Sequence, residues 1–234
     1  MIKPPPVRQL PLVFDHEPAT SRDDLIVSPS VHAAVAMIDK WPDWPSPVVV
    51  LAGPTGSGKS HLASIWAART GACRVELTAP ADDAVEAAAR APVLVEDVDR
   101  RAYDENALFH LINSVRTHGS SVLMTARRFP SGWKIALPDL ASRLKAATVV
   151  EIGEPDEELL AQVMVKLFAD RQVSVDDRII HWLVARMERS LAAAHLIVDR
   201  LDQLALARGT KINRALAAEA LARMDNGVSD IEPS

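Results

Sequence analysis

The sequence predicts an α/β fold of five parallel strands with intervening helices, followed by an all-helical segment. Two observations indicate this fold. Up to Ile152, short apolar runs rich in β-branched residues alternate with helix-like segments, which is typical of a parallel sheet covered on both faces. After Glu154-Pro155, apolar residues recur only at helical spacing.

The strands and helices of the predicted sheet region follow one another in regular order. An amphipathic segment from Ser28 or Ser30, either of which is a plausible N-cap, runs to Trp41. The expected strands are 48–52, 74–77, 93–96, 122–125 and 148–152, and the helices between them are 59–70, 82–90, 105–117 and 138–145.

The helical region contains four predicted helices. The first two carry apolar stripes through residues 159–168 and 179–187. The third spans about Ser190–Arg208 and ends at Gly209, a residue typical of helix C-termini, and the fourth begins after Asn213.

The chain is divided accordingly into four segments. Residues 1–24 form an extended, proline-rich leader that carries an apolar cluster at 9–14, and residues 25–153 form a nucleotide-binding α/β domain. Residues 154–226 form a helical lid domain, and residues 227–234 are a polar tail.

Composition excludes several classes of protein. With 234 residues, 48% of them apolar, the chain is long enough for a large core, so it is neither disordered nor collagen-like. Apolar runs such as Val48–Ala52 are far shorter than the roughly 20 residues of a membrane-spanning helix. The single cysteine, Cys73, cannot form an internal disulfide, and we expect a cytoplasmic protein. A net charge of −5 argues against nucleic-acid binding as its main task.

The strongest motif is a phosphate-binding loop that follows the first strand and opens a helix. It matches the pattern G-x-x-x-x-G-K-[ST] with Gly53, Pro54, Thr55, Gly56, Ser57, Gly58, Lys59 and Ser60. Glycines allow backbone N–H groups to approach phosphate oxygens. In this pattern Lys59 contacts the β- and γ-phosphates and the Ser60 hydroxyl is a Mg²⁺ ligand.

The third predicted strand ends in two acids, Glu96 and Asp97. At the carboxyl end of a strand beside a phosphate loop, such carboxylates hold Mg²⁺ and orient the attacking water. We assign Glu96 to the metal and Asp97 to catalysis, although Asp is the usual residue at the metal position. An acidic turn with no such role is the alternative reading.

Larger parts of the chain resemble a known family. The segments are Asp24–Ser30, the loop 53–60, Val93–Asp97, Leu137–Leu144 and Asp199–Leu204. In this order they resemble the DnaA branch of the AAA+ ATPases and, within it, the Hda-type regulators of replication initiation, over residues 9–225. The resemblance implies a sheet order of 5-1-4-3-2 and a nucleotide between the two domains, near Val27 and His61.

The resemblance also implies partners. Gln9, Leu10, Leu12 and Phe14 are similar to the peptide by which Hda-type proteins bind the DNA polymerase sliding clamp. Leu137–Leu144 is similar to the family's arginine-finger motif, which gives Arg143 a role in trans, although spacing alone favours a solvated surface residue. The implied function is stimulation of the hydrolysis of ATP bound to the initiator DnaA. DNA contact is then mainly indirect through the clamp, there is no membrane partner, and self-association is left open.

Several features bear on catalysis by the chain itself. Arg127 stands where relatives have an acidic sensor, and Ala192 stands where they have a lid arginine, for which Arg189 is a candidate replacement. Together with Glu96, these differences predict weak or no intrinsic hydrolysis. The resemblance implies bound ATP or ADP with Mg²⁺, and ADP in the active form.

Two alternative functions remain at the level of sequence. The first is a helicase-loader-like AAA+ ATPase that acts on a replicative helicase, against which the clamp peptide argues. The second is a P-loop kinase or nucleotide transferase, which the arginine-finger motif and the lid disfavour. Because the chain ends at Ser234, soon after the lid, we expect no DNA-reading helix-turn-helix and interpret it as a regulator rather than an initiator.

Overall fold

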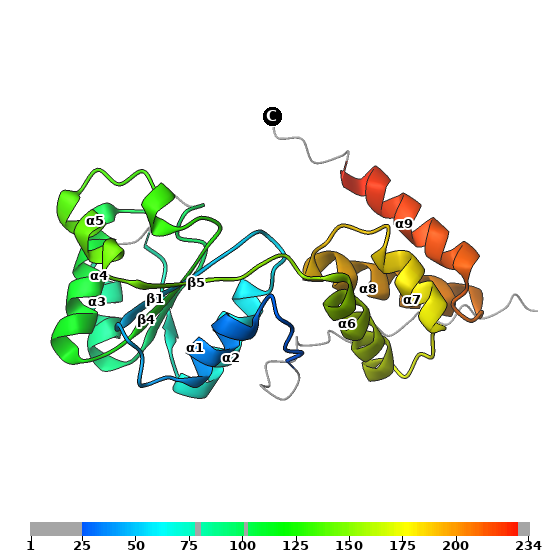
Figure 1. Ribbon diagram of the computed structural model, residues 1–234, viewed down its shortest axis with the longest axis horizontal. Coiled ribbons are helices and arrows are strands. Elements are labelled where there is room, and N and C mark those ends of the chain that lie inside the picture. The colour runs from blue at the N-terminus through cyan, green and yellow to red at the C-terminus, as the bar shows by residue number, and fades with distance from the viewer. Residues whose placement is uncertain (1–24, 78–80, 101–102, 229–234) are drawn as a thin grey trace, which may run out of the picture.

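The structure, a computed structural model, describes residues 25–77, 81–100 and 103–228. The predicted clamp-binding residues 9–14 lie outside these ranges. Figure 1 shows an α/β part and a helical part side by side, joined by the chain that follows β5. The loop predicted to bind phosphate faces the boundary between them.

The sheet has the predicted order. Its strands are β1 (Val48–Ala52), β2 (Cys73–Arg74), β3 (Val93–Val95), β4 (Val122–Ala126) and β5 (Thr148–Glu151). They are parallel and lie in the order β2-β3-β4-β1-β5, which is the predicted 5-1-4-3-2 read from the other edge. Since β1 pairs with β4 and β5, the loop that follows it emerges inside the sheet rather than at its edge.

Strand residues alternate between two covered faces. Val49 and Leu51 pack against α1 (His32–Asp39) and α2 (Lys59–Thr70). Val48 and Val50 belong to the other core, which includes residues from α3 (Ala81–Arg90), α4 (Glu105–His118) and α5 (Pro138–Lys145). Because both faces are covered, all five residues of β1 are buried, which explains why this strand reads as a continuous apolar run.

Two local predictions were wrong. The second strand is shorter and begins earlier than predicted, since an edge strand pairs on one side only and its neighbour β3 is itself three residues long. Neither Ser28 nor Ser30 caps α1: the N-cap is Val31, and the two serine hydroxyls bond to each other at 2.8 Å. The Ser28 carbonyl accepts the first amides of the helix instead.

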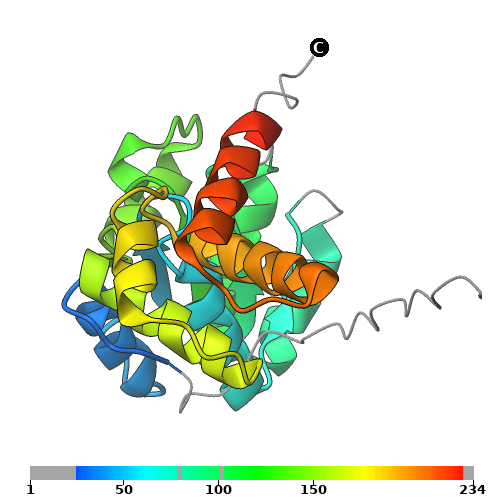
Figure 2. The ribbon, with the colours of Figure 1, turned by 90° about the vertical axis from the view of Figure 1, so that its right-hand side faces the viewer.

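The helical part consists of α6 (Glu157–Asp170), α7 (Asp177–Val184), α8 (Leu191–Arg208) and α9 (Arg214–Val228). The side chains of Asp156, Asp176 and Ser190 accept amide hydrogen bonds at the starts of the first three, as N-caps do. These helices enclose their own core, and Figure 2 shows α9 crossing α8. Within the described ranges, no helix is long and apolar enough to cross a membrane.

The core of the helical part predicts a position-dependent loss of stability along α8. Leu201 is fully buried, whereas Leu206 on the same helix is 65% exposed. We expect Leu201→Ala to lower the free energy of unfolding by about 2–5 kcal/mol because it leaves a cavity. Leu206→Ala should change it by less than about 0.5 kcal/mol. Urea denaturation of both variants measures the difference, and equal losses would contradict this assignment of the core.

Candidate nucleotide site

The loop 53–58 connects β1 to α2 through backbone that only glycine accommodates. At Gly53, a Cβ atom would lie 2.2 Å from the Ile152 carbonyl oxygen, so the loop starts in direct contact with the end of β5. Gly56 has φ +75°, and a Cβ there would lie 2.3 Å from the Cβ of Ser190. The glycines of the motif therefore allow close packing as well as an approach to phosphate.

Lys59 lies inside the loop that precedes it. Its Nζ donates to the carbonyl oxygens of Gly53 (2.7 Å) and Pro54 (2.5 Å), and to the Ser57 hydroxyl at 3.4 Å. Burial is the main cause that lowers the pKa of Lys59. The negative charge of Asp97 raises this pKa, the positive charge of Arg127 lowers it, and the negative charge of Asp99 raises it. An incoming phosphate would supply the negative charge that favours the protonated ammonium.

Asp97 is held next to this lysine in an unusual backbone conformation. Its φ of 53° is in the left-handed region, which is uncommon for a residue with a side chain. The amide of Asp97 donates to the hydroxyl of buried Thr125 at 2.9 Å, and its carboxylate pairs with Arg100 at 3.5 Å. Strained residues of this kind gather at functional sites, which supports the role predicted for Asp97.

The Glu96 carboxylate has a partner that the sequence did not suggest. Strand alternation places Glu96, like Leu94, on the face of the sheet that α1 and α2 cover. There it forms an ion pair with Arg74 of β2, whose other terminal nitrogen donates to the Ser64 hydroxyl of α2 at 2.6 Å. Arg74 is visible in the sequence, but its partners stand 10 and 22 residues away, so spacing gives no signal for the pairing.

The residues present fit a magnesium ion bound together with nucleotide phosphates. Ser60 is exposed in the first turn of α2, and Glu96 carries carboxylate oxygens, the ligands that Mg²⁺ prefers. No cluster of three or more His, Cys, Asp or Glu able to hold a metal occurs in the described part of the chain. A Mg²⁺ ion held by Glu96 would compete with Arg74 for the carboxylate.

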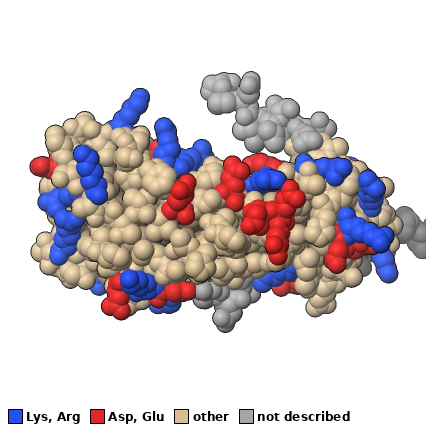
Figure 3. Space-filling model, in the orientation of Figure 1, with Lys and Arg blue, Asp and Glu red and all other residues tan. Residues whose placement is uncertain are grey.

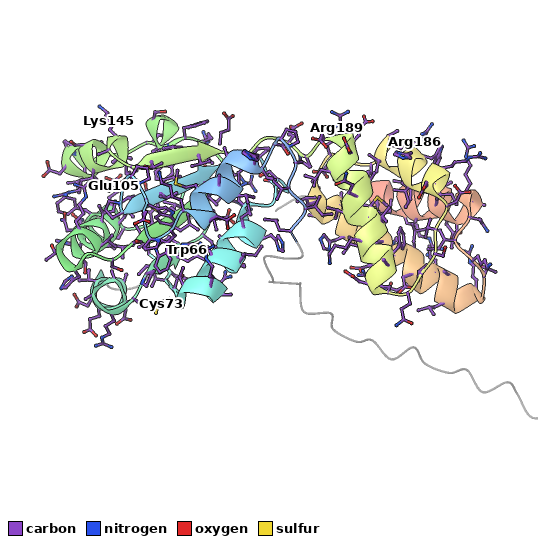
Figure 4. The ribbon with its side chains drawn as sticks, turned by 60° about the horizontal axis from the view of Figure 1, so that its bottom comes forward. Trp66, Cys73, Glu105, Lys145, Arg186 and Arg189 are labelled. Atoms are coloured by element: carbon purple, nitrogen blue, oxygen red, sulfur yellow. The ribbon has the colours of Figure 1, made fainter. Side chains whose placement is uncertain are left out.

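The helical part contacts the phosphate loop directly. The Leu191 amide, at the start of α8, donates to the Gly56 carbonyl oxygen at 2.8 Å, and Ser190 packs on the same glycine. Sequence reasoning did not identify these two residues. Arg189, the candidate replacement for a lid arginine, pairs with Glu157 at 2.7 Å, and Figure 4 shows it beside α6.

The other predicted residues lie in different places. Val27 is 43% exposed, on a segment joined to the end of the sheet by the Gly153 amide, which donates to Ser30. His61 follows Ser60 in α2 and is half-buried. Arg143 is not part of this site: it lies on α5, at the end of the α/β part far from the helical part (Figure 1), with its guanidinium carbon 4.9 Å from the Phe109 ring centre.

Comparison with known sequences gives partial relationships, among them a Haemophilus influenzae protein that is 27% identical over 103 residues, which cover 44% of this chain and 45% of that protein. No family model matches the chain. The chromosomal replication initiator protein DnaA of Sphingopyxis alaskensis is 29% identical over 119 residues, which cover 50% of this chain and 26% of that protein. The match therefore spans about a quarter of the initiator's length.

Comparison with solved structures shows the fold. Domain III of Thermotoga maritima DnaA superposes with a TM-score of 0.73 at 17% identity, covering 88% of this chain and 97% of that one. AMPPCP-bound DnaA from Aquifex aeolicus superposes with a TM-score of 0.64 at 17% sequence identity, covering 92% of this chain and 71% of that one. The Thermotoga maritima RuvB branch-migration motor superposes with a TM-score of 0.69 at 17% sequence identity, covering 87% of this chain and 71% of that one. The chain thus has an AAA+ fold like that of DnaA domain III.

The Arg74–Glu96 pair predicts a change in magnesium dependence. In Arg74→Ala the carboxylate is free for the metal, so Mg²⁺ should strengthen ATP binding more than it does in the unchanged chain. We expect the ratio of ATP dissociation constants in EDTA and in Mg²⁺ to rise about two- to fivefold, the range for releasing a partly exposed ion pair.

Isothermal titration measures this ratio. Arg90→Ala, which breaks the exposed Arg90–Glu86 pair on α3, is the matched control and should leave it unchanged. An unchanged ratio in Arg74→Ala would show that the pair does not compete with the metal.

Proposed function

We propose that this chain is a nucleotide-binding regulator of replication initiation. It binds the DNA polymerase sliding clamp and stimulates hydrolysis of ATP bound to the initiator DnaA, to which it contributes Arg143. The DnaA-like AAA+ fold and the partial sequence match to an initiator support a role in replication initiation. The leader residues Gln9–Phe14 and the position of Arg143 support the two specific activities.

The chain's own nucleotide is ATP or ADP, with ADP in the active form. The observation that carries this proposal is the loop 53–58, closely packed around the Lys59 ammonium at the start of α2. Backbone N–H groups and the helix N-terminus would hold the phosphates, with Lys59 as the cation. Mg²⁺, bound by Ser60 and Glu96, would supply charge neutralisation at the phosphates.

Binding rather than turnover is the chain's role. The Glu96 carboxylate is already paired with Arg74, and Arg127 stands beside Lys59 where relatives have an acid. Both features weaken the hold on a metal and on an attacking water. Intrinsic hydrolysis is therefore slow, and the nucleotide stabilises the contact between the loop and α8.

Arg143 acts on a neighbouring molecule. In phosphoryl transfer, the bond from the γ-phosphorus to the bridging oxygen breaks as water attacks, and charge builds on the phosphate oxygens. A guanidinium stabilises that charge. Because α5 and the loop 53–58 occupy different ends of the α/β part, Arg143 serves a nucleotide held by DnaA, not its own.

Loss of this arginine should abolish stimulation. We expect Arg143→Ala to lower the stimulated rate of ATP hydrolysis by DnaA on the order of 10³-fold, as for other arginine fingers. Arg116→Ala, which removes the same charge from the end of α4, is the control. Hydrolysis is measured with DnaA and DNA-loaded clamp. Full stimulation of DnaA by the Arg143→Ala variant would exclude an arginine-finger role. If the unchanged chain does not stimulate DnaA, a helicase-loader role is favoured.

The leader should bind the clamp. Gln9 hydrogen-bonds at a pocket rim, while Leu12 and Phe14 fill its apolar part. We expect Gln9→Ala with Phe14→Ala to reduce clamp binding at least tenfold and to remove the clamp's effect on DnaA hydrolysis. Surface plasmon resonance on immobilised clamp measures binding, with Ile2→Ala and Val7→Ala as the control. Intact binding in the first double variant would mean that the motif is wrongly assigned.

A further inference from the structure

Helix α5, which carries Arg143, begins without a cap of its own. Its N-cap residue, Leu137, makes no side-chain hydrogen bond to the helix. The carboxylate of Glu105 instead binds the two amides just before the helix: it accepts from the Ala136 amide at 2.9 and 3.1 Å and from the Leu137 amide at 2.7 Å. Glu105 is the first residue of α4, so α4 holds the segment that enters α5.

The same helix contacts Arg143 itself. Phe109 follows Glu105 by one turn, and its ring centre lies 4.9 Å from the guanidinium carbon of Arg143. Leu140 and Leu144 anchor α5 in the core beneath, where they are fully buried. The arginine thus projects from a helix that α4 holds by a charged hydrogen-bonded contact, by apolar packing and by an aromatic ring.

This arrangement leaves the donor groups of the guanidinium available. An arginine whose guanidinium lies over an aromatic face is restrained by that contact, while its N–H groups remain free to bind. Among the described residues, no carboxylate pairs with Arg143, although many of the chain's exposed arginines are paired. Phe109 therefore holds a cation in place without neutralising it.

The charged residues on α5 besides Arg143 are Asp139 near its start and Lys145 at its end. Figure 3 shows mainly Lys and Arg side chains, with a few Asp and Glu, over this end of the α/β part, and Figure 4 labels Lys145 at its outer edge and Glu105 in the same part. An anion approaching this end meets Arg143 already oriented.

We propose that Phe109 and Glu105 are positioning residues that hold the Arg143 guanidinium ready for a phosphate on a partner molecule. This inference rests on the proposed function, since the phosphate is that of a nucleotide bound to the partner. Glu105 fixes the start of α5, and Phe109 fixes the direction of the arginine side chain. An unrestrained arginine would lose rotamer freedom when it meets the phosphate, and prior stacking lowers that loss.

The first test needs no partner. In the chain alone, the Nε–H resonance of Arg143, assigned by its loss in Arg143→Lys, should show the upfield ring-current shift of a proton above an aromatic ring. Phe109→Leu should abolish that shift, and Phe109→Tyr should retain it. Absence of the shift in the unchanged chain would overturn the proposal whatever the chain's function.

The second test separates positioning from association. With DnaA and DNA-loaded clamp, we expect Phe109→Leu to lower the maximal stimulated rate on the order of tenfold, with less than a twofold change in the half-saturating concentration. Phe109→Tyr should restore the rate. Phe129→Leu, the same change at a phenylalanine that is 42% exposed, is the control.

The outcomes of this test are distinct. A loss through half-saturation alone would show that Phe109 acts in binding, and a higher maximal rate would show that the ring withholds Arg143; either overturns the proposal. If the unchanged chain stimulates DnaA and Arg143→Ala does not, an unaffected Phe109→Leu refutes positioning while the proposed function stands. If the unchanged chain itself fails to stimulate DnaA, the proposed function fails, and the resonance of Arg143 still decides whether the ring holds the guanidinium.

Discussion

The burial of β1 on both faces is the constraint on which the rest of the structure depends. This strand pairs on both sides and is covered by helices on both faces, so the chain that follows it leaves from its carboxyl end, inside the sheet. The chain must turn there between the end of β5 and the start of α8, where Gly53 touches Ile152 and Gly56 touches Ser190. Only a glycine-rich loop fits this space, so the packing that buries β1 also creates the candidate phosphate site.

This position makes the loop the meeting point of the two parts of the molecule. The Gly56 carbonyl accepts the Leu191 amide, so the first turn of α8 and the phosphate loop share a hydrogen bond. A ligand that reorders the loop must adjust or keep that bond. Under the proposed function, occupancy of the site would be coupled to the placement of the helical part through this bond.

The charges around the loop are already partly compensated within the protein. Arg74 pairs with Glu96, Arg100 pairs with Asp97, and the Asp99 carboxylate accepts from the amides of Arg127 and Arg128. Acids that are engaged in this way hold a metal or a water less readily than free ones. At the other end of the α/β part, the Arg143 guanidinium lies over the Phe109 ring without a pairing carboxylate among the described residues. Under the proposed function, the first group of charges would serve nucleotide binding and Arg143 would act on a partner.

The fold class and the loop motif 53–60 follow from the residues alone, because continuous apolar runs report strands buried on both faces and the motif contains glycines at positive φ. The sheet order followed from the family resemblance. Short-range patterns failed where a partner is distant, as for the two-residue β2 and the uncapped start of α1. Other contacts follow only from the folded chain. Arg74 pairs with Glu96, and the Leu191 amide donates to Gly56. Glu105 and Phe109 contact the start of α5 and Arg143. Such contacts join residues from different elements, and their geometry is set by how helices pack on the sheet rather than by any spacing along the chain.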